Sequence, residues 1–362
     1  MIDNVITANA GGNSDANISF ENDGANNVRI INSVGYNGGT QNYQVYGSFN
    51  LIDNCQVIAG TTGNDYFIVA RGNNSIFRNC YVERFVGHSG HGLCLKSVGV
   101  QTEYNLWENI EVGGIKSSME ARHDEVQHNV WRNIYVWENG YGGAQGTGGI
   151  HFLNGASYNI FDNIRVDGTT AFGVRTGASS EDPTATSQGH DNIVKNSSFY
   201  TLGTATAGDG VYYGTDSDGQ NRVWRDNKFI NCNWYGNKDF IENATSSTNE
   251  EDNEFINCTI TNTVSKLEST SSIFTNCNFY NNGHSTPSGT NITTLNPQFV
   301  DALNGDFHLQ ATSGIRGIGA NNSSVHYDAD GVERIDGDYS IGAYEFDAEA
   351  DYYFSATGDD VT

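Results

Sequence analysis

The sequence repeats one short motif, in which two apolar residues and a variable residue precede an asparagine and a small or β-branched residue. It reads LIDNC at 51–55, IFRNC at 76–80, LWENI at 106–110, VWRNI at 130–134 and IFDNI at 160–164, and it continues to IFTNC at 273–277. Successive motif asparagines lie 19 to 35 residues apart. A period of this size is typical of a solenoid, in which each repeat forms one coil that stacks on its neighbours.

Composition indicates that the coils consist of strands. The 362 residues include 45 Asn and 43 Gly but only 3 Pro, and Asn and Gly are poor formers of helix interiors. Between them lie short β-branched and aromatic runs, which favour strands joined by turns. We therefore predict an all-β chain, a right-handed single-stranded parallel β-helix of roughly ten coils. At about 4.8 Å per coil it forms a rod about 50 Å long.

The motif also predicts how the coils stack. Its asparagines adopt the left-handed conformation of a sharp bend, and their side-chain amides form an internal Asn ladder from coil to coil. Trp107, Trp131 and Phe161 share one column, and we expect them in the core. Five of the six cysteines directly follow an Asn and none forms a C-x-x-C pair. We interpret them as small buried hydrophobic residues, with no disulfide or zinc site.

The chain divides into three parts. Residues 1–295 are predicted to form the coils, with loop insertions that are clearest at 140–149 and 176–189. Residues 296–347 contain NPQFVD at 296–301 and IGAYEF at 341–346. They resemble the closing segment of many secreted bacterial β-helix proteins. Residues 348–362 resemble the start of a further domain, so we expect a linker or the start of a following domain there, in a longer multidomain protein.

Charge limits the range of partners. The chain has 18 Lys and Arg against 43 Asp and Glu, a net charge of −25, which argues against nucleic acid and anionic membranes. No stretch approaches the roughly 18 apolar residues that a membrane span needs. The polar start of the sequence does not resemble a signal peptide. Seven of the 18 cations nevertheless fall between Arg71 and Arg132, and five of the nine histidines between His88 and His151. Such local basicity suits an anionic ligand.

Within this region, Lys96 and Arg122 lie 26 residues apart, which is close to one coil. Side chains at matching positions of adjacent coils stand about 5 Å apart. Repulsion between the two cations would favour the uncharged lysine, which can act as a base, while the arginine stays charged and can hold a carboxylate. Such a pair suits proton abstraction beside a carboxylate. Two solvated side chains on the outside of a sheet would show the same spacing.

At these residues the sequence resembles the β-helix polysaccharide lyases of the alginate lyase and chondroitinase B family. The shared elements are Lys96-Ser97, Arg122-His123 and TGGI at 147–150, separated by the Asn repeats 105–109 and 129–133. The resemblance covers about seventy residues. It implies that Lys96 removes the C5 proton of a uronic acid, that Arg122 neutralises charge or protonates the leaving O4, and that His123 binds or orients the substrate. We assign further substrate contacts to Arg84, His91, Glu120 and His151.

The sequence departs from this family at its calcium ligands. Where the family has two acidic residues before the lysine, this chain has Ser89 and His91, which hold a hard cation poorly. Calcium therefore stays possible but unsupported, and we predict no metal ligands and no certain cofactor. Protonated His91 and the neighbouring cations are an alternative means of neutralising the substrate carboxylate. The spacing from Lys96 to Arg122 is also somewhat longer than the family usually shows.

Several alternatives remain open. Five histidines (His88, His91, His123, His128 and His151) could include a transition-metal site. Asp-rich turns at 216–219 and 328–331 could bind calcium, although solvated turns are the simpler interpretation. Four carboxylates (Glu103, Glu120, Asp124 and Glu125) offer candidates for a glycoside hydrolase. A non-catalytic carbohydrate-binding or adhesive module is the third possibility. Our leading hypothesis is a secreted or cell-surface, bacterial-type lyase that cleaves an anionic, uronic-acid-containing polysaccharide by β-elimination.

Overall fold

The computed structural model describes most of the chain. The described residues are 1–8, 16–20, 26–36, 41–59, 66–84, 91–96, 99–113, 117–137, 148–169, 172–178, 187–201, 208–216, 223–243, 250–269, 271–322 and 324–346. Three predicted segments therefore fall partly or wholly outside the description: residues 348–362, residues 140–147 of the first insertion and residues 179–186 of the second. Among the described residues, no helix is long and apolar enough to cross a membrane.

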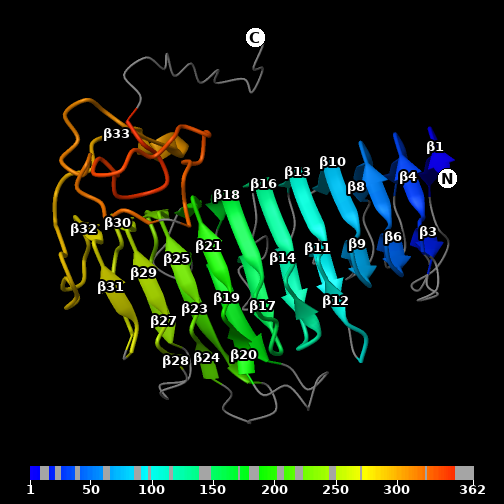
Figure 1. Ribbon diagram of the computed structural model, residues 1–362, viewed down its shortest axis with the longest axis horizontal. Coiled ribbons are helices and arrows are strands. Elements are labelled where there is room, and N and C mark those ends of the chain that lie inside the picture. Colours follow the sequence, from blue (N-terminus) through cyan, green and yellow to red (C-terminus); the bar gives the residue numbers. More distant parts are fainter. Residues whose placement is uncertain are drawn as a thin grey trace.

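The chain winds into a right-handed parallel β-helix, as predicted, with its coils stacked side by side along the long axis (Figure 1). One large parallel sheet, sheet A, contains two strands per coil, which merge into one long strand in the middle coils. Its strands are β1 (Ile2–Asp3), β2 (Ile6–Ala8), β4 (Arg29–Ile31), β5 (Val34–Tyr36), β7 (Leu51–Asp53), β8 (Gln56–Ala59), β10 (Ile76–Arg84), β13 (Leu106–Gly113), β16 (Val130–Trp137), β18 (Ile160–Thr169), β21 (Ile193–Lys195), β22 (Ser198–Thr201), β25 (Lys228–Ile230), β26 (Asn233–Tyr235), β29 (Glu254–Ile256), β30 (Thr259–Thr261), β31 (Ile273–Thr275) and β32 (Asn278–Tyr280).

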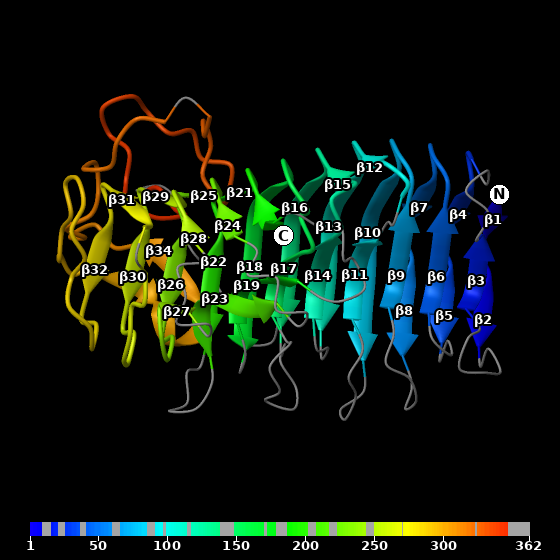
Figure 2. The ribbon, with the colours of Figure 1, turned by 90° about the horizontal axis from the view of Figure 1, so that it is seen from below.

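A second parallel sheet, sheet B, contains one strand per coil and faces sheet A across the core (Figure 2). Its strands are β3 (Ala16–Phe20), β6 (Gln41–Tyr46), β9 (Tyr66–Arg71), β11 (His91–Lys96), β14 (Ser117–Arg122), β17 (Gly148–Leu153), β19 (Phe172–Ala178), β23 (Asp209–Asp216) and β27 (Ile241–Asn243). Short strands complete some coils: β12 (Thr102–Glu103), β15 (Val126–Gln127), β20 (Ser187–His190), β24 (Val223–Arg225) and β28 (Glu250–Glu251). Parts of both predicted insertions are thus strands, namely the starts of β17 and β20 and the end of β19.

The core stacks like residues from coil to coil. Phe77, Trp107, Trp131 and Phe161 are register partners on successive strands of sheet A and are fully buried. The ring centroids of Trp131 and Phe161 lie 4.5 Å apart with nearly parallel planes, a favourable offset-stacked arrangement. All six cysteines are buried and free. The predictions of core aromatics and of unpaired buried cysteines are both confirmed.

The asparagines form two stacks rather than one. The motif asparagines have left-handed φ values near 50° and bond through their amides, as in the 3.1 Å bond from Asn133 Nδ2 to Asn109 Oδ1. In the earlier coils (Asn54, Asn79, Asn109 and Asn133) they lie at the surface and not in the interior as we expected, whereas in the later coils (Asn196, Asn231, Asn257 and Asn276) they are buried. The internal stack consists of asparagines four residues earlier, such as Asn129, whose Nδ2 donates to Asn159 Oδ1 at 3.0 Å. The bend turns the motif side chain outward and the preceding asparagine inward.

Residues 296–346 form a compact cap against the later coils of sheet A (Figure 1). The cap contains β33 (Phe299–Asp301), the 3₁₀ helix η1 (Ala302–Asn304) and β34 (Asp306–Leu309), with β33 antiparallel to β34. The motif asparagines bind it directly, because Asn257 Nδ2 donates to Ala320 O at 2.7 Å and Asn163 Nδ2 donates to Ala329 O at 2.7 Å. The cap therefore covers polar groups that the earlier coils expose.

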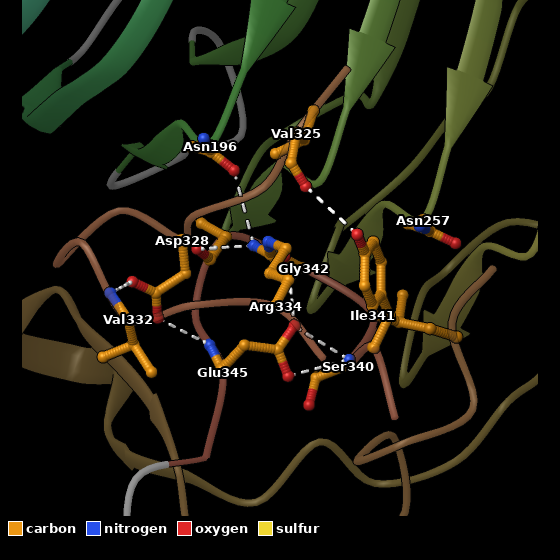
Figure 3. A network of polar contacts seen from close by, with 12 residues as sticks. Asn196, Asn257, Val325, Asp328, Val332, Arg334, Ser340, Ile341, Gly342 and Glu345 are labelled. Atoms are coloured by element: carbon orange, nitrogen blue, oxygen red, sulfur yellow. Dashed lines mark hydrogen bonds and ion pairs between the residues drawn. The ribbon is translucent and has the colours of Figure 1, made fainter. Parts of the chain in front are cut away.

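A buried ion-pair network holds the cap together (Figure 3). Arg334 donates to the Glu345 carboxylate and to the carbonyls of Gly342 and Ala343, and it is 4% exposed. Asp328 accepts backbone N–H bonds from Asp330, Val332 and Glu345. Backbone amides thus hold the Asp328 carboxylate within the 328–331 turn. The other Asp-rich turn, 216–219, lies almost wholly outside the described residues.

Candidate functional site

The candidate site lies on the outer face of sheet B. Side chains alternate along a strand, and in β11 and β14 the core receives Leu93, Leu95, Met119 and Ala121. The intervening residues therefore point outward. They are Cys94 and Lys96 on β11, and Glu120 and Arg122 on β14.

Lys96 and Arg122 are register partners on neighbouring strands, which places their Cα atoms about 4.8 Å apart. Both side chains are partly exposed. The charges of both side chains act on the Cys94 thiol. Burial and the Glu120 carboxylate raise the pKa of this thiol, while the charges of Arg122 and Lys96 lower it. The ammonium and the guanidinium therefore share one face of the sheet.

Glu120 and His151 form the next part of this face. They are register partners on β14 and β17, and His151 Nδ1 lies 3.4 Å from Glu120 Oε1. Each side chain is only 1% exposed. The pair thus forms the floor of the site beside Arg122, where a carboxylate can fix the orientation of the imidazole.

Arg175 and Tyr212 extend the row, and our sequence reasoning missed both. Arg175 on β19 is the register partner of His151, and Tyr212 on β23 is that of Arg175. Burial lowers the pKa of the Arg175 guanidinium, and the charges of Tyr212 and Glu120 partly oppose this effect. The guanidinium lies 5.9 Å from the centre of the Tyr212 ring. The signal was available, because Arg175 follows His151 by 24 residues, the length of one short coil.

The other predicted contacts lie elsewhere or are only partly described. His123 has a left-handed φ of 88° and is fully buried, with its Nδ1 3.5 Å from Asn154 Nδ2. The residue has no exposed surface that a sugar could contact. Arg84 ends β10 on sheet A, and His91 begins β11. The side chains of these two residues lie outside the described part of the structure.

The described histidines of the basic region (His123, His128 and His151) lie in different surroundings. His128 is exposed and stacks between Tyr104 and Tyr158, with ring centroids 5.6 and 5.2 Å apart, whereas His123 is buried and His151 lies on sheet B. His88 lies outside the described residues. Among the residues that the structure describes, the group with metal-ligand geometry is acidic and includes no histidine.

This acidic group lies farther along the same face of sheet B. It consists of Asp209 on β23 and of Asp239 and Glu242 near β27, with Lys238 among them. Burial and the adjoining Glu242 carboxylate raise the pKa of Asp209 to about 8. Sequence reasoning missed the group, although Asp209 and Asp239 lie 30 residues apart, which is within the range of one coil.

The carboxylates considered for hydrolysis are scattered. Glu120 alone among the four lies on the same face as Lys96 and Arg122. Glu103 belongs to β12, and Asp124 and Glu125 lie in the connection between β14 and β15. Glu125 Oε1 accepts the Gly99 N–H at 2.8 Å. These residues do not supply the facing pair of carboxylates that glycoside hydrolysis uses.

No protein-family model and no curated protein matches the sequence. Several solved structures share the architecture. The pectate lyase Pel9A is 13% identical and covers 95% of this chain and 96% of its own, with a TM-score of 0.58. An alginate lyase from Paenibacillus sp. str. FPU-7 is 12% identical and covers 80% and 98%, with a TM-score of 0.43. A GH87 α-1,3-glucanase catalytic domain in complex with nigerose is 14% identical and covers 75% and 49%, with a TM-score of 0.45. At 13% identity the likeness to Pel9A shows the β-helix fold alone.

Proposed function

We propose that this protein is a polysaccharide lyase that cleaves an anionic, uronic-acid-containing polymer by β-elimination. The observation that carries the proposal is the register pairing of Lys96 with Arg122 on the outer face of sheet B. Both cations are partly exposed there, in a chain with a net charge of −25. A locally cationic surface on an acidic protein selects an anionic ligand.

The proposed reaction assigns a separate task to each cation. The Arg122 guanidinium pairs with the uronate carboxylate, which acidifies the C5 proton by stabilising the negative charge that develops on the carboxylate. The uncharged Lys96 amine takes the C5 proton, the C4–O4 bond breaks, and a C4=C5 double bond forms. Since a guanidinium is a poor proton donor, Lys96 in its ammonium form is the better source of the proton for O4. A single group then serves as base and acid.

The floor of the site supports this arrangement. Glu120 lies beside Arg122 on β14 and accompanies His151 on β17. The Glu120 carboxylate repels the carboxylate of the substrate, so the substrate carboxylate binds nearer to the two cations. Arg175 continues the row of register partners by one strand, and can hold the next uronate of the chain.

The metal that the family resemblance implies does not fit this site. At the matching positions this chain has Ser89 and His91 in place of carboxylates, and hard cations require several oxygen ligands. We therefore assign neutralisation of the substrate carboxylate to Arg122 and route no step through calcium. We further propose that the protein is secreted or lies at the cell surface, where such polymers occur, as part of a longer chain.

A panel of uronate polymers tests the proposal: alginate, chondroitin and dermatan sulfates, and pectate, each with and without a chelator. We expect ultraviolet absorbance from an unsaturated product on at least one polymer, with the chelator causing no loss. Lys96→Ala should abolish this signal. Lys228→Ala removes a half-exposed lysine from sheet A and should leave activity unchanged.

Two outcomes would favour the alternatives. Release of reducing ends without absorbance would indicate a glycoside hydrolase. Binding without any product would indicate a carbohydrate-binding or adhesive module. Circular dichroism of both lysine variants shows whether a loss of activity reflects chemistry or a loss of fold.

A further inference from the structure

Three carboxyl groups converge on the outer face of sheet B, away from the proposed lyase site. Asp209 opens β23, Asp239 precedes β27, and Glu242 lies within β27. One oxygen from each lies within 4.8 Å of the others. From Arg122 to Asp209 the sheet crosses three strand spacings, by way of β17 and β19, or about 14 Å. The cluster is therefore separate from the Lys96 and Arg122 pair.

Burial distinguishes this cluster from an ordinary acidic surface. Asp209 is 2% exposed and Asp239 has no exposed surface. Asp209 Oδ1 is a buried oxygen that receives no hydrogen bond within the described part of the chain. A buried carboxylate oxygen without a donor is costly. Asp209 belongs to the group of three carboxyl groups, so a ligand that accepts oxygen lone pairs would satisfy its oxygen.

The Lys238 ammonium neutralises part of the negative charge of the three carboxyl groups. Its Nζ lies 2.8 Å from Asp239 Oδ2, 3.5 Å from Glu242 Oε2 and 3.8 Å from Asp209 Oδ1. Only the first of these is a close ion pair. Three carboxylates with one ammonium still leave two negative charges when all four groups are ionised. The local charge therefore matches a divalent cation.

The spacing argues against a hydrolytic role for these acids. A pair of hydrolase carboxyl groups stands about 5 to 9.5 Å apart, with the sugar between them, whereas these oxygens lie within 4.8 Å of one another. The Glu242 and Lys238 side chains are 26% and 21% exposed. They leave an opening that suits an ion better than a sugar.

We propose that Asp209, Asp239 and Glu242 bind one divalent cation of the hard, oxygen-preferring class, such as Ca²⁺. An all-carboxylate donor set favours Ca²⁺, Mg²⁺ or Mn²⁺ over metals that prefer imidazole or thiolate. Binding displaces the Lys238 ammonium towards solvent, through the side where that lysine is already exposed. The ion then ties β23 to the segment that leads into β27 and stabilises these two coils.

Titration of the full chain with Ca²⁺ and Tb³⁺ tests the site without any substrate. We expect one equivalent of Tb³⁺ to bind, with emission sensitised by Tyr212, the register partner of Glu242, and we expect Ca²⁺ to compete for it. Ca²⁺ at a hundredfold excess over its Kd should raise Tm by about 4 °C. Asp209→Asn and Glu242→Gln should each weaken Ca²⁺ binding about tenfold or more.

Two further variants keep the test sharp. Lys238→Met removes the competing ammonium, so Ca²⁺ should bind at least as tightly as in the wild type. Glu254→Gln breaks the pair with Lys228 on sheet A, away from the cluster, and should leave binding unchanged. The proposal is overturned if the wild type binds none of Ca²⁺, Mg²⁺ and Mn²⁺ at millimolar concentration, or if the ion binds equally well to Asp209→Asn. The same Ca²⁺ titration gives either answer whether or not the protein is a lyase.

Discussion

Raising the pH from 6 to 10 should loosen the cap, because His308 is held there as a cation. Its Nδ1 lies 2.5 Å from Asp306 Oδ1 and its Nε2 lies 2.5 Å from Asp330 Oδ2. Burial alone would lower the pKa of His308, but the bonds to the two carboxylates raise it to about 9. A folded-state pKa above the unfolded value of 6.5 contributes stability that is complete below pH 6.5 and is lost as the pH rises through 9.

The size of the effect follows from the shift. A change from 6.5 to about 9 is worth about 3 kcal/mol at 1.36 kcal/mol per pH unit. Asp330 is 44% exposed, so solvent screens its part of the interaction, and about 2 kcal/mol is the better value. This corresponds to a change of about thirtyfold in the equilibrium for opening the cap.

Limited proteolysis measures that equilibrium, with cleavage sites in the cap assigned by mass spectrometry. The rates of the wild type and of His308→Gln are compared at each pH, so that the protease's own pH dependence cancels. At pH 6 the variant should be cleaved about thirtyfold faster, and the ratio should fall towards one above pH 9. His326→Gln removes an exposed histidine of the cap and should match the wild type. A His308 ratio that stays constant from pH 6 to 10 would refute the reasoning.

Three other substitutions test the packing. Trp131→Ala removes a fully buried member of the aromatic stack and should lower the free energy of urea unfolding by about 3–5 kcal/mol. Tyr158→Ala, at an exposed ring, should lower it far less. Equal losses would contradict the claim that the buried stack stabilises the coils. Arg334→Met leaves the buried Glu345 carboxylate without its ion partner and should destabilise the cap by about 3–5 kcal/mol, measured as faster proteolysis within residues 324–346. The double variant Arg334→Met/Glu345→Leu should recover the lost stability, because it no longer has an unpaired buried carboxylate. If the cap of the double variant is as unstable as that of the single variant, the unpaired charge is not the cause of the loss. Asn129→Ala breaks the internal ladder on both sides and should lower the free energy of unfolding by about 1–3 kcal/mol. A loss near zero in the same urea assay would show that water replaces the amide.

The repeat predicted the fold because one motif occupies the same place in every coil. Trp107 and Trp131 follow each other at the motif's second position, and stacked coils must bring such residues together. The same pattern did not show which asparagine is buried. Asparagines recur from coil to coil at both positions, that of Asn129 and that of Asn133. Which of the two side chains points into the core depends on the backbone conformation of the bend, and the repeat pattern does not show this.

The site was predictable where one coil has a regular length. The 26 residues from Lys96 to Arg122 gave the correct register, although spacing alone did not show which face the pair occupies. Arg175 follows His151 by 24 residues and could have been found by the same spacing. Asp209 was missed for a different reason, because it follows Arg175 by 34 residues and the unequal lengths of the coils hide that the two share a face of sheet B. Burial of His123 was also hidden, because it depends on the left-handed turn that follows Arg122.

The mass of the products released from a uronate polymer tests the central claim most directly. Elimination at the Lys96 and Arg122 pair predicts oligosaccharides whose new non-reducing end lacks the elements of one water, relative to the products of hydrolysis. These products should disappear in Lys96→Ala. Fully hydrated products, or unsaturated products that persist in that variant, would contradict the assignment of the chemistry to this face of sheet B.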